Sequence, residues 1–349
     1  MNLARFLTGS LSVLLFNLAQ IQACPPPEQY MPPLRLAGSP EAELWSRYSR
    51  GYIENNNTHT DLEPRWARVP ESSSQWWPSA SILYCYADGA EETLDNDLRS
   101  AWDIWIQAGV PSRFVFKQGT DADCAASNVE NVLTVSLDSE AKLKTSLGKV
   151  SGGSKMILNP STAIGMENPI WNYAHEIGHA WGLMHEHQRP DQWDSNHGGT
   201  ASDNKFIWNC ENLDDYDTKV ASLGEFSINQ VCTKRASAAE LNFSALDYLP
   251  TTVRQMENSG TVDYDSIMMY PSVAGGIQTE SGRKTVYTLA DGTAIGYNNV
   301  PTVNDVDNLI AMYPASSSSS TTCFLYQKCS QYLTSFKSTV GCMVADDDD

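Results

Sequence analysis

The chain has 349 residues, of which 42 are acidic and 23 are basic, so its formal net charge is −19. Hydrophobic residues make up 41% of the chain, which is enough for a sizeable buried core. A chain with this excess of negative charge has no electrostatic reason to bind nucleic acid or an anionic membrane surface, and we expect neither partner. Beyond the N-terminus no run of about 18 residues is continuously apolar, which argues against a membrane span.

The N-terminus has the features of a secretory signal peptide. The basic Arg5 precedes a short apolar run at residues 11–16, and a proline tract follows Cys24. We therefore predict a signal peptide over residues 1–23, cut near Ala23, and a secreted, extracellular protein. One alternative is that Cys24 is the lipid-anchored cysteine of a bacterial lipoprotein, although Gln22 fits that pattern poorly.

The eight cysteines predict disulfides rather than a thiolate site. None of them forms a Cys-x-x-Cys pair of the kind used for zinc or redox chemistry. An even number of cysteines in a secreted protein is typical of disulfide bonds. The spacing favours a local loop closed by Cys210 and Cys232 and allows a bond between Cys85 and Cys124. The full connectivity stays open, because it cannot be deduced from sequence alone.

Two segments flank the central part of the chain. Residues 24–68 are rich in proline, asparagine and arginine without a sustained period, and we predict a pro-segment, with a plain N-terminal arm as the alternative. Arg65 and Arg68 are candidate processing sites. Residues 316–322 form a Ser/Thr-rich flexible linker. Residues 323–349 form a small tail that contains three cysteines and ends in four aspartates.

The central part alternates predicted strands and helices. Residues 82–86 are continuously apolar or aromatic, as in a buried strand, and residues 91–107 have one apolar face with helical period. A second helix opens at Asn168-Pro169. From that helix to about residue 260 we expect irregular, polar structure. Further strands are expected at 114–116, 132–137 and 155–159, and a final helix at 302–313. This order indicates a mixed α/β (α+β) fold.

The segment from His175 to His185 contains the residues of a metal site. His175 and His179 lie one helical turn apart, so their imidazoles project from one face and can share a tetrahedral Zn²⁺. Glu176 is next to the first ligand but angled off the metal, where a base can take a proton from metal-bound water. His185 cannot reach the ion on a continuous helix, because ten residues correspond to about 15 Å of rise. Gly182 removes this difficulty, since glycine can end the helix in the left-handed conformation and reverse the chain.

Three histidines and one water form an open coordination shell, which is typical of a catalytic zinc. Zinc lowers the pKa of its water and polarises the scissile carbonyl. The pattern His-Glu-x-x-His alone is only suggestive, but the addition of Gly182 and His185 reduces a chance match to about one in ten thousand. A helix with ordinary surface or core histidines is therefore the less favoured interpretation.

The long histidine motif resembles that of the metzincin metalloendopeptidases, and the stretch from His185 to Asp191, with Glu186 after the third histidine, is similar to the astacin family. Residues 263–270 resemble the methionine turn of the same family. By that match Met268 would be the apolar floor beneath the histidines, and Tyr270 a switchable zinc ligand that stabilises the oxyanion. Without the upstream motif, both residues would be read as core.

The resemblance implies a metzincin-like fold over residues 69–315, with a mixed sheet and the zinc helix in an N-terminal half and an irregular C-terminal half with a final helix. It implies one Zn²⁺ per chain, protein or peptide substrates in a cleft across the zinc helix, a monomer, and synthesis as a zymogen. In this family the residue matching Glu186 contacts the processed N-terminus, which here would be Val69. Members often favour acidic side chains just after the cleaved bond, and Arg283 or Lys284 is a candidate positive pocket. Met269 departs from the family, which usually has histidine there.

Two other functions remain open at this point. A zinc-containing binding protein without activity is one, although such relatives usually lack a ligand or the base, and all are present here. A different secreted zinc hydrolase is the other, and Glu186 argues against it on family analogy. The favoured function is a secreted zinc metalloendopeptidase with Glu176 as general base.

Overall fold

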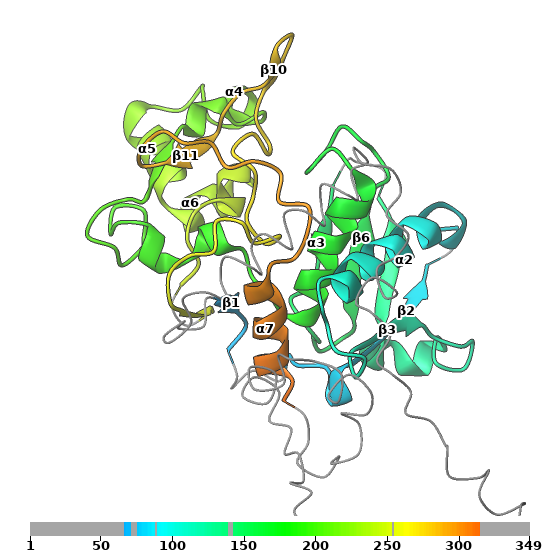
Figure 1. Cartoon of the computed structure of the whole chain (residues 1–349). Helices are drawn as coiled ribbons and strands as arrows, with labels where there is room; N and C mark the ends of the chain where they lie inside the picture. The colour runs from blue at the N-terminus through cyan, green and yellow to red at the C-terminus, as the bar shows by residue number, and fades with distance from the viewer. Residues whose placement is uncertain (1–65, 71–74, 88, 139–141, 253–254, 315–349) are drawn as a thin grey trace, which may run out of the picture. The chain divides into compact units, whose positions relative to one another are not determined.

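A computed structural model describes residues 66–70, 75–87, 89–138, 142–252 and 255–314 (Figure 1). The predicted signal peptide, the predicted pro-segment before residue 66, the linker and the C-terminal tail lie outside these residues. No helix in the described part of the chain is long and apolar enough to cross a membrane.

One mixed sheet forms the first half of the described chain. Its strands are β2 (Ser81–Tyr86), β3 (Val115–Gln118), β4 (Leu133–Leu137), β5 (Lys144–Thr145) and β6 (Ser154–Leu158), in the spatial order β3-β2-β4-β6-β5. The first four strands in this order are parallel, and β5 pairs antiparallel with β6 at the edge. The four predicted strands are confirmed with shifts at their ends, and β3 begins at Val115 instead of Phe114. Strand β5 was not predicted, because two residues are too few to show an alternating pattern.

Two long helices pack against one another beside this sheet (Figure 1). Helix α2 (Glu91–Gln107) has the predicted bounds, and its Trp105 indole donates a 2.8 Å hydrogen bond to the carbonyl of Ala174. Helix α3 (Pro169–Trp181) begins as predicted at Asn168, whose side chain accepts hydrogen bonds from the backbone of Ile170 and Trp171. A capping asparagine followed by proline is a strong helix start, so the position of α3 is set locally.

The final helix, α7 (Val303–Met312), confirms the predicted element at 302–313. It begins with a capping box in which Thr302 and Asp305 each accept a hydrogen bond from the other's backbone N–H. Its buried face, which includes Leu309 and Met312, joins the same core as α2, α3 and the sheet. The mixed α+β fold class is therefore confirmed.

The prediction of an irregular stretch to about residue 260 is wrong. This stretch contains the helices α4 (Tyr216–Lys219), α5 (Glu225–Thr233) and α6 (Arg235–Glu240). Sequence periodicity missed them because they are short and have few buried residues. The buried residue of α5 is Val231, and that of α6 is Ala238. Helices of this length depend on tertiary packing more than on their own sequence.

Short antiparallel pairs complete the second half. They are β7 (Phe206–Trp208) with β11 (Tyr287–Leu289), β9 (Gln278–Thr279) with β10 (Gly282–Arg283), and β1 (Trp66–Arg68) with β8 (Glu257–Ser259). A second core forms around Trp193, Phe243 and Tyr287. The disulfides Cys85–Cys124 and Cys210–Cys232 confirm both pairings considered from the sequence. The other four cysteines lie outside the described residues.

Candidate metal centre

The end of helix α3 brings the third histidine back to the first two. Gly182 has φ of 104°, in the left-handed region, as predicted. The N–H of Leu183 donates to the carbonyl of Gly178 at 3.0 Å, and that of Gly182 to the carbonyl of His179 at 2.9 Å, which is the hydrogen-bond pattern of a Schellman cap. The chain therefore reverses at Gly182, and His185 returns to the face of the helix that carries the other histidines.

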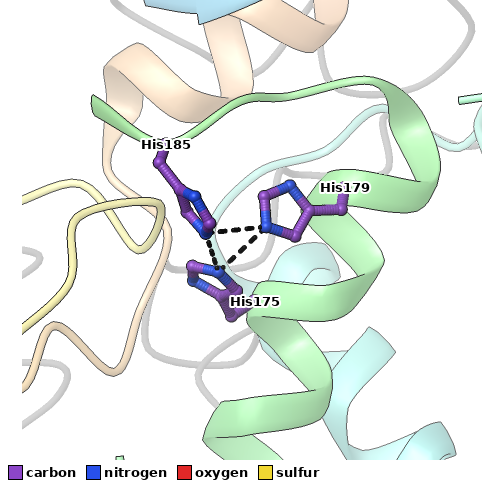
Figure 2. Close-up of side chains that lie close together, drawn as sticks. All are labelled: His175, His179 and His185. Atoms are coloured by element: carbon purple, nitrogen blue, oxygen red, sulfur yellow. Dashed lines mark hydrogen bonds between the residues drawn. The ribbon is translucent and has the colours of Figure 1, made fainter. Parts of the chain in front are cut away.

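The three imidazoles meet at their Nε2 atoms (Figure 2). The Nε2 atoms of His175 and His179 are 3.1 Å apart, those of His175 and His185 are 3.0 Å apart, and those of His179 and His185 are 2.9 Å apart. His175 and His179 project from consecutive turns of α3, and His185 comes from the segment after it (Figure 2). Three ligand atoms at such separations can surround one ion with Zn–N distances of about 2.0–2.1 Å.

The hydrogen bonds of the Nδ1 atoms orient the rings of His175 and His179 so that their Nε2 atoms face the metal site. The Nδ1 of His175 lies 2.7 Å from the carbonyl of Ile267, and the Nδ1 of His179 lies 2.8 Å from the carbonyl of Leu183. Carbonyl oxygens only accept hydrogen bonds, so both rings are protonated on Nδ1 and their Nε2 lone pairs point inward. Burial lowers the pKa of His175 to about 4 and that of His179 to about 3, which keeps both rings neutral and able to bind a metal.

This donor set fits zinc. Neutral imidazole is a preferred ligand of Zn²⁺, and converging lone pairs repel one another unless a cation lies between them. Glu176 supplies a further indication, because its carboxylate is buried, its Oε2 makes no hydrogen bond of ordinary geometry with the described residues, and the hydroxyl of Thr145 lies near it. Burial raises the pKa of Glu176 to about 7. A buried glutamate with a raised pKa, adjacent in sequence to the first of three inward-facing imidazoles, is typical of a functional site rather than of a packed core.

The methionine turn, at residues 263–270, packs directly on helix α3. A Cβ atom at Gly178 would lie 2.4 Å from the Sδ atom of Met268, so glycine is needed at that point of α3. Met268 is buried in the first core with α2 and α3, whereas the next residue, Met269, is buried in the second core. The turn therefore has residues in both cores and contacts helix α3 at Gly178, between the first two histidines.

The first residues of the turn are held by helix α7. The carboxylate of Asp305 accepts hydrogen bonds from the backbone N–H of Ile267 at 3.1 Å and from the hydroxyl of Ser266. The carbonyl of Ile267 in turn accepts from His175. Sequence reasoning missed Asp305 as a supporting residue; the Thr-x-x-Asp pattern at residues 302–305 is the signal that could have identified it as a capping residue.

Residues 69–197 match the family model of the astacin peptidases. This segment of the chain is astacin-like. The matched segment contains the three histidines and Glu176, whereas the methionine turn lies beyond it.

Two solved structures are similar to this astacin-like chain. High choriolytic enzyme 1, a hatching enzyme zinc-protease from Oryzias latipes (medaka fish), is 18% identical with a TM-score of 0.43, over 69% of this chain and 96% of that one. Myroilysin is 17% identical with a TM-score of 0.42, over 72% of this chain and 99% of that one. A comparison with curated protein sequences gave no match.

Tyr270, the second predicted catalytic residue, lies beside the histidines of the astacin-like site. Its ring meets that of His185 edge-on with centroids 4.4 Å apart, and lies 5.8 Å from the ring of His175. Burial and the nearby carboxylate of Asp247 raise the pKa of Tyr270 well above its ordinary value, so the hydroxyl keeps its proton. The structure thus brings together all five predicted site residues, from two segments about 85 residues apart in sequence.

Met269, which stands where astacins usually have histidine, is fully buried near the hydroxyl of Tyr287. Tyr287 also donates a hydrogen bond to the carbonyl of Tyr270. The departure from the family therefore lies in the second core and not among the metal ligands.

The predicted N-terminus and the predicted positive pocket have other contacts in this structure. Val69 donates its N–H to the carbonyl of Gly182, while the buried carboxylate of Glu186 lies 3.4 Å from the guanidinium of Arg189. Arg283 donates hydrogen bonds to the carbonyls of Ala163 and Gly165. It also lies 3.7 Å from the carboxylate of Glu167. The side chain of Arg283 therefore links β10 to the loop before α3.

Proposed function

We propose that His175, His179 and His185 hold one Zn²⁺ per chain and that Glu176 is the general base for the hydrolysis of peptide bonds. The observation that carries this proposal is the convergence of three Nε2 atoms within 3.1 Å of one another, on a helix that also carries the buried glutamate Glu176 next to the first ligand. Bound zinc would supply a Lewis acid that acidifies a water molecule and polarises the scissile carbonyl.

Glu176 and Tyr270 would carry the proton and charge transfers. Glu176 accepts a proton from the attacking water and returns it to the amine that leaves, and a pKa near 7 suits both transfers. Tyr270 keeps its proton and can donate it in a hydrogen bond to the oxyanion that develops on the substrate carbonyl. Both roles follow from the neighbours of these side chains and from their burial.

A protein substrate would meet the site between the two cores. Met268 and Met269 of the methionine turn belong to different cores, and the carbonyl of Ile267 in the same turn contacts His175, so the site lies where the two cores meet. This placement supports an extended peptide across helix α3, in the cleft expected from the sequence.

We also propose that the protein is secreted and made as a zymogen. The predicted signal peptide and the two disulfides, Cys85–Cys124 and Cys210–Cys232, support an oxidising compartment. Ala67, Arg68 and Val69 are all buried around the predicted cleavage bond. Because proteases cut accessible, mobile segments, cleavage after Arg68 requires β1 to separate from β8 first. N-terminal sequencing of the secreted protein should find Val69 first, and a mature start at residue 66 or earlier would contradict this assignment.

The substitution Glu176→Ala tests the proposed chemistry. It should abolish digestion of casein while the purified protein keeps its zinc, because the base is removed and the three ligands remain. A matched control is Glu225→Ala, which removes an exposed carboxylate at the start of α5 and should leave digestion unchanged. Digestion by the Glu176→Ala protein at the wild-type rate would contradict the assignment of Glu176 as the general base.

A further inference from the structure

We propose that Gln188 is a positioning residue for the third metal ligand, His185. The Nδ1 atom of His185 lies 2.9 Å from the Oε1 atom of Gln188. An amide oxygen only accepts hydrogen bonds, so His185 donates from Nδ1 and its Nε2 lone pair faces the other two histidines. This inference rests on the proposed function, because it assigns a role within the same metal site.

His185 differs from the other two ligands in how its ring is held. The rings of His175 and His179 are fixed by backbone carbonyls, those of Ile267 and Leu183, which no side-chain substitution removes. Both also project from α3, whose backbone sets their direction. His185 lies beyond the helix in extended backbone, with φ of −66° and ψ of 129°, and a side chain holds its ring. Its orientation therefore depends on the identity of residue 188.

The amide of Gln188 has one favourable orientation. Its Nε2 atom donates to two carbonyl oxygens, those of Leu246 and Leu249, each at 3.3 Å. A flipped amide would place its oxygen against both carbonyls and its NH₂ group against His185. The residue is only 5% exposed, so water does not replace these partners. The acceptor end is consequently directed at His185.

The same contacts connect the metal site to the second core. The carbonyl of Gln188 accepts a hydrogen bond from the N–H of Thr251 at 3.0 Å, and Arg235 donates to the same two carbonyls as the Gln188 amide. The turn that contains Leu246 and Leu249 is thus held from two sides. Partners of this kind typically change metal affinity by 10–100-fold when they are removed.

The test compares two buried glutamines of the same segment. Gln188→Met keeps the length of the side chain but removes both ends of the amide. Gln192→Met is the matched control, because Gln192 is 8% exposed and its Oε1 accepts from the hydroxyl of Tyr264 instead of a histidine. The zinc dissociation constant is measured by competition with a chelator, together with casein digestion at saturating zinc and thermal unfolding of the metal-free proteins.

We expect Gln188→Met to weaken zinc binding by about 10–100-fold, to change the absorption spectrum of the Co²⁺-substituted protein, and to regain activity as zinc is raised. Gln192→Met should bind zinc as the wild type does, and the two metal-free variants should unfold at similar temperatures. Wild-type zinc affinity in Gln188→Met would overturn the inference, and so would an equal loss in both variants.

The variant Gln188→Glu keeps the acceptor for His185 and provides the test if Gln188→Met does not fold. It should hold zinc within a few-fold of the wild type, whereas a loss as large as 10–100-fold would show that the acceptor is not what matters. A wild-type protein that binds no zinc would instead contradict the proposed function itself, so the two failures are distinguishable.

Discussion

Substitution of Gly178 by alanine tests the contact between the metal helix and the methionine turn. In an open helix interior this change stabilises a protein by about 1 kcal/mol, because alanine loses less backbone freedom on folding. Here the new Cβ would lie 2.4 Å from the Sδ atom of Met268 and 3.3 Å from the ring of Trp105. The sulfur would have to retreat by about 1 Å to reach an ordinary contact distance.

Met268 cannot make that movement freely. It is buried, its N–H donates to the hydroxyl of Ser266, and its carbonyl accepts from the N–H of Glu186. Overpacking of such a site costs about 1–3 kcal/mol, so Gly178→Ala should lower the free energy of unfolding by up to about 2 kcal/mol after the gain in propensity is subtracted.

The same substitution made in a Met268→Ala protein shows whether the contact with Met268 causes this loss of stability. In Met268→Ala the sulfur is absent, and Gly178→Ala should then be neutral or stabilising by up to about 1 kcal/mol. Urea unfolding of the metal-free single and double variants measures both effects. The reasoning is refuted if Gly178→Ala stabilises the wild type, or if its effect is the same in the two backgrounds.

Three further outcomes follow from the structure. Gly182→Ala should destabilise the protein by about 1–2 kcal/mol, because alanine is strained at φ of 104°, and should weaken zinc binding measured with a chelator, since His185 depends on this turn. Arg283→Ala should lower the melting temperature, because it removes the hydrogen bonds to Ala163 and Gly165, and should leave any preference for acidic residues in a peptide library unchanged. Lys284→Ala tests the other candidate for the positive pocket in the same library. Loss of a preference for acidic residues in the Arg283→Ala variant would instead support a role for Arg283 in the predicted positive pocket. Removal of zinc by a chelator should abolish digestion, and added zinc should restore it; activity that persists without metal would contradict a metal-dependent reaction.

Much of the metal site was predictable because its geometry is local. The spacing of His175 and His179 on one helix, and the glycine needed before His185, are properties of a short segment. Helix α3 also carries its own start signal in Asn168 and Pro169. Tyr270 could be placed at the site only through a resemblance, since no spacing rule connects it to the helix.

The supporting residues could not be predicted, because their contacts join distant parts of the chain. Gln188 meets Leu246 and Leu249 through a turn between short helices that have no clear period, and Asp305 reaches Ile267 from the last helix. The same limit explains why α4, α5 and α6 were expected to be irregular. Their stability comes from packing in the second core rather than from an amphipathic pattern.

The central claim is that one zinc ion is held by three imidazoles. X-ray absorption at the zinc edge, on purified protein with its metal content determined, tests it most directly. The expected result is one zinc per chain with three nitrogen neighbours of the imidazole type at about 2.0–2.1 Å and one further oxygen neighbour from water. Fewer imidazole neighbours, or sulfur ligands at about 2.3 Å, would contradict the assignment of His175, His179 and His185.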